Sequence, residues 1–123
     1  MNALLNIPGR MPGLNDYSDA ERKHRQLAAK MKAAETQLVA LCARSLPVFY
    51  HPIHLTIVYR ELNRKRDKDN IAFAKKFILD GLVMAGRIPN DTWAWIDGWS
   101  ESFVVDTKDP GISVMIKEVK EFD

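Results

Sequence analysis

Two aspartates that could hold a metal ion, at positions 67 and 69, lie between a run of bases and a predicted helix. In an extended segment, residues two apart share a side, so the carboxylates of Asp67 and Asp69 would point together. Like charges at that spacing repel unless a cation lies between them, and hard oxygen ligands favour Mg²⁺ or Mn²⁺. A simpler interpretation is also open, in which Asp69 or Asn70 caps the following helix and Asp67 makes a surface ion pair.

A metal site of this kind needs a third acid, and Asp91 is the candidate. It follows the second predicted helix in a turn that could return the chain to the same end of the sheet. The alternative is a turn aspartate that bonds its own backbone. Helical geometry places Lys76 and Asp80 close to the line of Asp69, although these two can equally form an i,i+4 ion pair.

Charge is distributed unevenly along a chain whose total is nearly neutral. The 123 residues include 18 Lys and Arg against 16 Asp and Glu, a net charge of +2. Residues 60–76 carry seven bases and three acids, hence +4, whereas residues 97–109 carry four acids and one base, hence −3. This polarity can create a basic face for nucleic acid. The single Cys42, the absence of a signal-peptide pattern and the lack of a long apolar run predict a non-membrane protein in a reducing, intracellular setting.

The pattern of elements predicts one mixed α/β (α+β) domain over residues 1–123, with a small sheet of about four strands packed against two main helices. A short strand at residues 3–7 precedes a turn rich in Pro and Gly. Residues 53–60 alternate between apolar and polar, as a strand with one buried face does. Residues 103–105 and 112–116 are interpreted as a final hairpin, because Asp109, Pro110 and Gly111 between them form a turn signal.

Two helices are expected between these strands. Ser18 is predicted to open the first, with Glu21 completing a capping box, and Pro47 to end it. Apolar residues at steps of three and four define its core-facing stripe, which consists of Leu27, Met31, Ala34, Leu38 and Leu41. The second helix begins near Asn70 and ends at a capping Gly86, and its stripe consists of Ile71, Ala74, Ile78 and Leu82.

In its acidic motif and in the helix that follows it, the chain resembles the RusA family of Holliday junction resolvases, in particular its phage and prophage members. The resemblance rests on residues 67–70, which match the family's Asp-x-Asp-Asn, on the helix end at residues 76–82, and on Asn90 with Asp91. The loop at residues 12–17 is also similar to the family's Pro-rich, Asn-bearing loop. The chain departs from the family at Asn90, where an aspartate is common, and in the position of the lysine on the second helix.

The resemblance implies a homodimeric, Mg²⁺-dependent endonuclease of RusA-like fold, in which Mn²⁺ can substitute, that nicks four-way branched DNA symmetrically in recombination and repair. Asp67, Asp69 and Asp91 would bind the metal, and Lys76 would complete the catalytic site, with Lys75 in reserve. The DNA-binding set would consist of Asn15, Arg64, Lys65, Arg66, Lys68, Asn70 and Lys75. No small-molecule cofactor and no membrane are expected. The implied location is the cytoplasm of a bacterial cell, with a phage or prophage gene.

Other functions are expected to fit less well. A Mg²⁺ nuclease for flaps or forks is the alternative within the same chemistry, and a non-catalytic DNA-binding protein is the alternative outside it. His51 and His54 lie three apart on a strand, hence on opposite faces, which disfavours a zinc site. Trp93, Trp95 and Trp99 are expected to pack in the core or at a dimer interface rather than to stack on bases.

Overall fold

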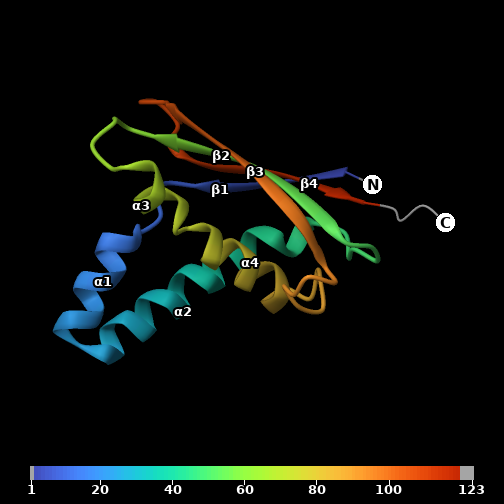
Figure 1. Cartoon of the computed structure of the whole chain (residues 1–123), viewed down its shortest axis with the longest axis horizontal. Coiled ribbons are helices and arrows are strands. Elements are labelled where there is room, and N and C mark those ends of the chain that lie inside the picture. The colour runs from blue at the N-terminus through green and yellow to red at the C-terminus, as the bar shows by residue number, and fades with distance from the viewer. Residues whose placement is uncertain (1, 120–123) are drawn as a thin grey trace.

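Figure 1 shows the computed structural model of the chain, which describes residues 2–119. Four strands form one open, mixed sheet, and the helices lie against one face of it. The predicted α+β class with a sheet of about four strands is confirmed.

The elements have the following bounds. The strands are β1 (Asn2–Pro8), β2 (Ile53–Glu61), β3 (Ile96–Val105) and β4 (Gly111–Glu118). The α-helices are α1 (Leu14–Lys23), α2 (Arg25–Cys42), α3 (Lys68–Ala72) and α4 (Lys75–Met84). A short 3₁₀ turn, η1 (Ala43–Ser45), follows α2.

Strand β2 is an inner strand of a sheet whose order is β1-β4-β2-β3. It pairs in parallel with β3 on one side and antiparallel with β4 on the other, and β4 pairs antiparallel with β1. The predicted hairpin between the last two strands is therefore wrong, because residues 106–110 carry the chain across the end of β2. The backbone N–H of Asp106 donates to the carbonyl of Glu61 at 2.8 Å and fixes this crossing. A turn signal in sequence does not specify which strand the chain pairs with next.

The core lies between the sheet and the helices. Alternate residues of β2 are buried, as the two-residue period predicts, namely Ile53, Leu55, Ile57 and Tyr59. Strands β1 and β4 add apolar residues to the same face, namely Leu5, Ile7, Ile112, Val114 and Ile116. Burial of each such side chain contributes about 1.5–3 kcal/mol, so this layer is the main source of stability for the sheet.

The first predicted helix is in fact two helices. Helix α1 starts four residues before Ser18, and the extended backbone of His24 (φ −165°, ψ 124°) separates it from α2. The ring Nδ1 of His24 accepts a hydrogen bond from the backbone N–H of Gln26 at 3.1 Å and so caps α2. The predicted start at Ser18 is wrong because a contact further upstream caps α1. There the backbone N–H of Gly13 donates to Asp16 Oδ2 at 2.9 Å.

The core-facing side of α2 also differs from the predicted stripe. Leu27 and Leu41 are exposed, and the buried residues are Ala28, Thr36 and Val39. Close approach to α4 explains the shift, because a Cβ atom added at Gly81 would lie 2.4 Å from Cγ1 of Val39. The contact between α2 and α4 is thus made by small residues, and a stripe of large apolar side chains does not predict it.

The second predicted helix is divided into α3 and α4 by a turn at Phe73 and Ala74. Its predicted stripe remains buried at Ile71, Ala74, Ile78 and Leu82. Gly86 has φ +70°, which confirms the prediction of a glycine that ends this helical segment.

Candidate functional site

A pocket of about 650 Å³ opens where β2 ends. Its walls are the loop between β2 and α3, the first turn of α3 and the last three residues of β3. Asp67 and Asp69 both line this pocket, and the bases Arg64 and Lys68 line it with them. The structure thus brings the predicted acidic pair to an open site with positive charge beside it.

The two carboxylates differ in how they are engaged. Asp67 occupies the N-cap position of α3, where its backbone carbonyl accepts from the N–H of Ile71 at 3.1 Å. Its side chain makes no capping bond, and within residues 2–119 it has no ion pair either. Asp69 accepts only a local bond, from the backbone N–H of Asn70 at 2.9 Å. The Asp67 carboxylate therefore takes no part in capping α3. Both acids are exposed to an incoming ligand.

Asp91 lies at the other end of the sheet. Strands β2 and β3 run parallel, so the residues before β3 and the residues after β2 are at opposite ends of this strand pair. Asp91 lines a separate pocket with the first residues of β3, which spans ten residues or about 30 Å. The expectation that the turn returns Asp91 to Asp67 and Asp69 within one chain is wrong, because the crossover through α3 and α4 ends where β2 began (Figure 1).

The donor set at the pocket suits one kind of metal ion. Within the described part of the chain, no three His, Cys, Asp or Glu side chains form a group that could hold a metal alone. Mg²⁺ often uses only one or two carboxylates and completes its shell with water and substrate phosphate oxygens. Asp67 and Asp69 meet that requirement, since both are exposed in an open pocket and present hard oxygen ligands.

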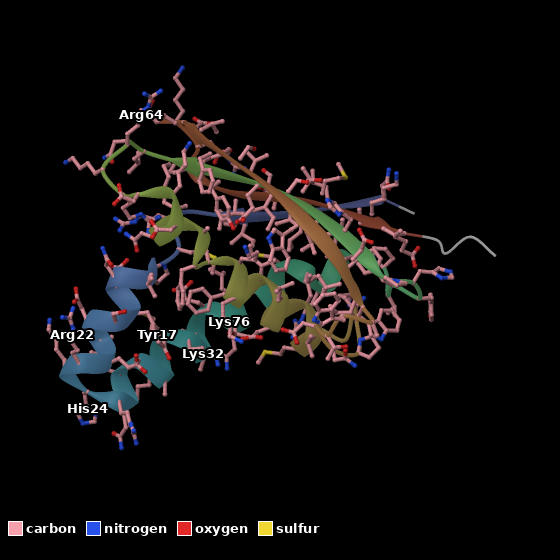
Figure 2. The ribbon with its side chains drawn as sticks, viewed as in Figure 1. Tyr17, Arg22, His24, Lys32, Arg64 and Lys76 are labelled. Atoms are coloured by element: carbon pink, nitrogen blue, oxygen red, sulfur yellow. The ribbon has the colours of Figure 1, made fainter. Side chains whose placement is uncertain are left out.

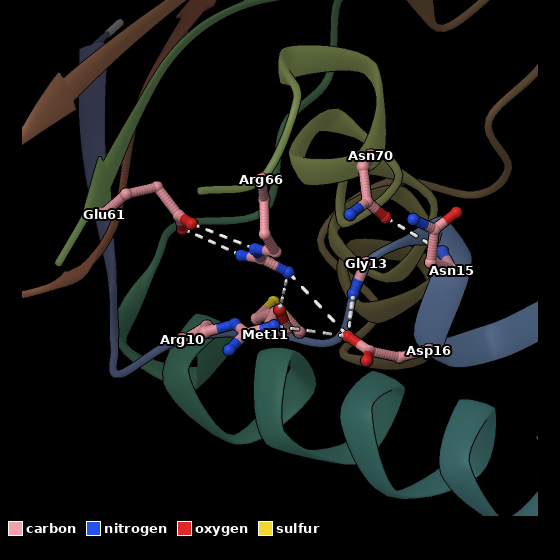
Figure 3. A network of polar contacts seen from close by, with 8 residues as sticks. All are labelled: Arg10, Met11, Gly13, Asn15, Asp16, Glu61, Arg66 and Asn70. Atoms are coloured by element: carbon pink, nitrogen blue, oxygen red, sulfur yellow. Dashed lines mark hydrogen bonds and ion pairs between the residues drawn. The ribbon is translucent and has the colours of Figure 1, made fainter. Parts of the chain in front are cut away.

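Arg66 is engaged in holding the fold together. Figure 3 shows its guanidinium in a two-point contact with Glu61, at 3.0 and 2.8 Å, with both side chains only 12% exposed. The same group donates to the carbonyl of Met11 at 3.1 Å and lies 3.9 Å from Asp16. Its donors are thus used to tie the loop before α1 to the end of β2. The predicted role of Arg66 in gripping phosphates does not fit this placement.

Asn15 and Asn70 meet at the start of α1, although 55 residues separate them. The backbone N–H of Asn15 donates to Oδ1 of Asn70 at 2.9 Å (Figure 3). Gly13 occupies the N-cap position and has no side chain, so Asn70 supplies the missing acceptor from another part of the chain. A Cβ atom at Gly13 would lie 2.4 Å from that same Oδ1. Both predicted asparagines therefore lie beside the pocket loop, and Asn70 has a structural role there.

The two candidate lysines of α4 point in different directions. Lys75 is 20% exposed, and its Nζ donates to Glu101 Oε1 at 3.0 Å and lies 4.2 Å from the ring centroid of Trp99. Lys76 is 52% exposed and forms the alternative i,i+4 pair with Asp80 at 3.6 Å. Figure 2 shows Lys76 below the sheet, away from the labelled Arg64. Neither lysine lines the pocket, so the prediction that Lys76 completes the acidic site is not supported by its position.

The cluster around Glu101 extends to Tyr59. The hydroxyl of Tyr59 donates to Glu101 Oε2 at 2.7 Å, and its ring stacks on Phe103 at a centroid distance of 4.9 Å. Burial raises the pKa of Tyr59 above its ordinary value, and the contact with the Glu101 carboxylate raises it further. Lys75 on α4 pairs with the other oxygen of Glu101. The cluster therefore links α4, β2 and β3.

Three bases near the pocket remain available for a ligand. Arg64, Lys65 and Lys68 are exposed, and within residues 2–119 none of them forms an ion pair with an acid. The Nζ of Lys68 lies 5.7 Å from the ring centroid of Phe103, over the pocket. Lys68, predicted only as a DNA contact, is thus the lysine that lines the pocket together with the two acids.

Sequence reasoning missed Glu61 as a structural residue of this site. The sequence does contain a signal for this role, because the two-residue period of β2 places Glu61 on the same face as Tyr59 and Ile57. A charged residue that continues a buried face requires a partner, and Arg66 is that partner.

The tryptophans and histidines only partly follow expectation. Trp95 packs against the core, whereas Trp93 is 98% exposed, so core packing is wrong for Trp93. His54 contacts Asp97 at 3.2 Å and Ser100 at 3.2 Å on the open face of the sheet. These contacts assign His54 to the link between β2 and β3.

Comparison with known proteins gives no match, either to a family model or to a curated protein. In the described part of the chain, no helix combines the length and the apolar character that crossing a membrane requires.

Proposed function

We propose that the chain is a Mg²⁺-dependent endonuclease for branched DNA, with four-way junctions as its principal substrate. The observation that carries the proposal is the pocket at the end of β2, where Asp67 and Asp69 share a wall with Arg64 and Lys68. Phosphodiester hydrolysis requires an activated water and stabilisation of charge on the phosphate and leaving oxygens, and a bound Mg²⁺ can supply both. Mn²⁺ can substitute for it at the same oxygen ligands.

The chain's own residues have separate tasks in this proposal. Asp67 and Asp69 hold the metal, and Lys68 stabilises negative charge that grows on the phosphate. Arg64 and Lys65 contact flanking phosphates and position the strand with little reading of bases. Arg66 and Asn70 keep the loop in shape through their contacts with Glu61 and with the start of α1.

Cleavage of labelled DNA tests the proposal. The substrates are a mobile four-way junction, a fork, a flap and a linear duplex, each with Mg²⁺, with Ca²⁺ or with EDTA. Asp67→Asn and Asp69→Asn should each lower Mg²⁺-dependent junction cleavage by about 10²-fold or more, with binding in Ca²⁺ unchanged or tighter. Asp19→Asn is the matched control, because Asp19 is an exposed acid on α1 whose only partner in residues 2–119 is Arg22.

The lysine assignment has its own test. Lys68→Ala should lower the cleavage rate by about 10-fold or more, whereas Lys76→Ala should leave it nearly unchanged. The reverse result would return the catalytic role to α4.

One observation favours a second candidate function, a DNA-binding protein without catalysis. Residues 2–119 of a single chain contain no three-carboxylate group, which leaves fewer metal ligands than many nucleases use. Salt-sensitive junction binding without cleavage of any substrate would establish this alternative. Cleavage of the fork or flap in preference to the junction would instead identify a flap or fork nuclease.

A further inference from the structure

A helical hairpin, formed by α1 and the first half of α2, extends away from the sheet (Figure 1). Little of it is buried, because Ala20 and Ala28 are the only buried residues in the range 14–35. Residues 21–27, which form its tip, are all exposed. The hairpin therefore presents most of its surface to solvent.

The hairpin carries a dense positive charge. Residues 22–32 contain five bases and no acid, a higher density of net charge than in residues 60–76. All five bases are exposed, and only Arg22 forms an ion pair within residues 2–119, with Asp19. The four unpaired bases are Lys23, Arg25, Lys30 and Lys32. Exposed bases that cluster without acids are typical of a surface that contacts phosphate.

Helix stability accounts for only part of this charge. Arg22 and Lys23 lie in the last turn of α1, where the helix dipole favours bases. Arg25, in contrast, is the first residue of α2, where the dipole disfavours a base, and the first turn of α2 contains no acid. Lys32 forms no ion pair within residues 2–119, although Glu35 follows it by three residues. Arg25 and Lys32 thus carry charge that the fold does not use.

Arg25 and Lys32 share one side of α2. At about 100° per residue, seven residues bring Lys32 to within about 20° of Arg25, and Ala29 lies between them along the helix. Ala29 is exposed, and its small side chain leaves room for close approach of a ligand. Val39 lies further along the same side and packs against Gly81 of α4. The side that bears the two bases is therefore the side of α2 that faces α4 later in the helix.

The start of the hairpin is fixed to the loop that carries the acidic pair. The backbone N–H of Asn15 donates to Oδ1 of Asn70, the residue after Asp69. Figure 2 shows the tip residues Arg22 and His24 in the same half of the molecule as Arg64. A DNA strand held at the pocket can thus continue along the hairpin.

We infer that the hairpin is a second DNA-binding element, in which Arg25 and Lys32 contact the phosphates of a duplex arm that leaves the pocket. The seven residues between them span about 10 Å, which corresponds to about three phosphates of one strand along the duplex axis. A lipid surface fits less well, because the small Ala29 between the two bases offers no large apolar anchor. The assignment to a junction arm rests on the proposed function, whereas the binding of duplex phosphates does not.

Salt-dependent binding in Ca²⁺ tests the hairpin without any cleavage. Arg25→Gln with Lys32→Gln should weaken binding to a duplex and to a junction by about 10-fold, and should reduce the salt slope of the affinity by about 2. The matched control is Arg44→Gln with Lys117→Gln, which removes two exposed bases without partners in residues 2–119 from η1 and β4. Both variants should unfold at the wild-type temperature, since every altered side chain is exposed. Equal losses in the two variants, or no loss in the hairpin variant, would overturn the inference.

The same hairpin variant distinguishes a duplex from other polyanions. A single strand of the same sequence and vesicles of phosphatidylglycerol with phosphatidylcholine are compared with the duplex. The largest loss of affinity should occur with the duplex. A loss confined to the single strand or to the vesicles would overturn the assignment to a duplex arm.

Photochemical cross-linking tests which side of α2 faces the DNA. Cys42 is the only cysteine, so Ala29→Cys is made with Cys42→Ala and labelled with a photoreactive group. Ala34→Cys in the same background is the control, because Ala34 is also exposed but lies about 180° around the helix from Arg25. Ala29→Cys should cross-link to a duplex arm several-fold more than Ala34→Cys. Equal or reversed yields would overturn the assigned side.

Failure of the hairpin and failure of the proposed function are distinguishable. A wild-type protein that cleaves no substrate, but loses duplex affinity on Arg25→Gln with Lys32→Gln, would contradict the function and leave the hairpin inference standing. A wild-type protein that cleaves junctions, with the hairpin variant equal to its matched control in binding, would leave the function standing and remove the hairpin from the DNA-binding surface.

Discussion

The two ends of β3 differ in how far their charged residues are used by the fold. One end of β3 lines the pocket that contains Arg64 and Lys68 and is here called the basic end; there Arg66 is tied to Glu61 and Asn70 caps α1. The other end lines a pocket that contains Asp91 and Asp97 and is here called the acidic end; there Asp91 has no partner within residues 2–119, and Trp93 is almost fully exposed. The charged residues of the basic end are thus partly used by the fold, whereas at the acidic end Asp97 is paired with His54 and the charge of Asp91 is left unused by the described contacts.

Within one short segment of the chain, some charged side chains are used by the fold and others remain available for a ligand. Seven bases in residues 60–76 suggest a uniform DNA-binding stretch. The contacts divide them, because Arg66 and Lys75 hold elements together while Arg64, Lys65 and Lys68 remain exposed. Mutations at neighbouring positions should therefore have effects of different kinds.

The largest effect on stability is expected at the basic end from Arg66→Ala. Loss of the guanidinium leaves Glu61 charged, mostly buried and unpaired, which should lower the free energy of unfolding by about 3 kcal/mol. Urea unfolding measures this change, with Arg64→Ala as the control for loss of an exposed positive charge nearby. Similar unfolding midpoints for the two variants would show that the basic end is no more tightly built than the rest of the surface.

A smaller loss, about 2 kcal/mol, is expected for Gly13→Ala, because the added Cβ would lie 2.4 Å from Oδ1 of Asn70. Asn70→Ala alone should cost about 1 kcal/mol through loss of the α1 cap. The double variant should lose less than the sum of the two, since removal of the amide relieves part of the clash. Strict additivity in thermal unfolding would mean that the two residues are not in contact.

Lys75→Ala tests the middle of β3, between the two ends. It removes a hydrogen bond to Glu101 and should cost about 1–2 kcal/mol, whereas Lys76→Ala should cost about 0.3 kcal/mol. Chemical unfolding of the two variants in parallel gives the difference. A greater loss for Lys76→Ala would show that α4 is rotated from the orientation described.

Alkaline pH provides a measure of the same cluster. The raised pKa of Tyr59 means that its neutral form is favoured in the folded state, so its contribution to stability is complete below the ordinary pKa of about 10. Above that pH the free energy of unfolding should fall, by about 1 kcal/mol at pH 11. Tyr59→Phe should remove this part of the pH dependence, and an unchanged slope would place the hydroxyl outside the cluster.

The smallest effect is expected at the acidic end. Trp93→Ala should change the free energy of unfolding by less than about 0.5 kcal/mol, because the side chain is 98% exposed. Trp95→Ala is the matched comparison and should destabilise measurably, since Trp95 packs against the core. A large loss for Trp93→Ala in a monomeric sample would remove the contrast between the two ends.

The periodicity of apolar residues was sufficient to predict the elements that bury one regular face. The alternation in β2 and the stripe of residues 71–82 both correspond to buried positions. It failed where contact depends on small residues or on distant partners. Helix α2 lies close to α4 at Val39 and Gly81, and Asn70 caps a helix 55 residues away. Neither contact is marked by a pattern in the neighbouring sequence.

The acidic pair of the site was predictable because its two members are neighbours in sequence. The position of Asp91 was not, because it depends on whether the crossover between β2 and β3 is parallel or antiparallel. Periodicity identifies strands but not their relative direction. The structural roles of Glu61 and Arg66 depend equally on the burial of one strand end, which only the folded chain determines.

The pairing of β1 with β4 has a consequence for the order in which the chain can fold during synthesis. Residues 2–8 are made early, yet β4 at residues 111–118 is the only strand of the described chain that they pair with. At about 5–20 residues per second, a ribosome needs roughly 5–20 s to make the residues between them. Strand β1 therefore has no strand to pair with until β4 emerges, and the sheet closes only after translation has passed residue 118.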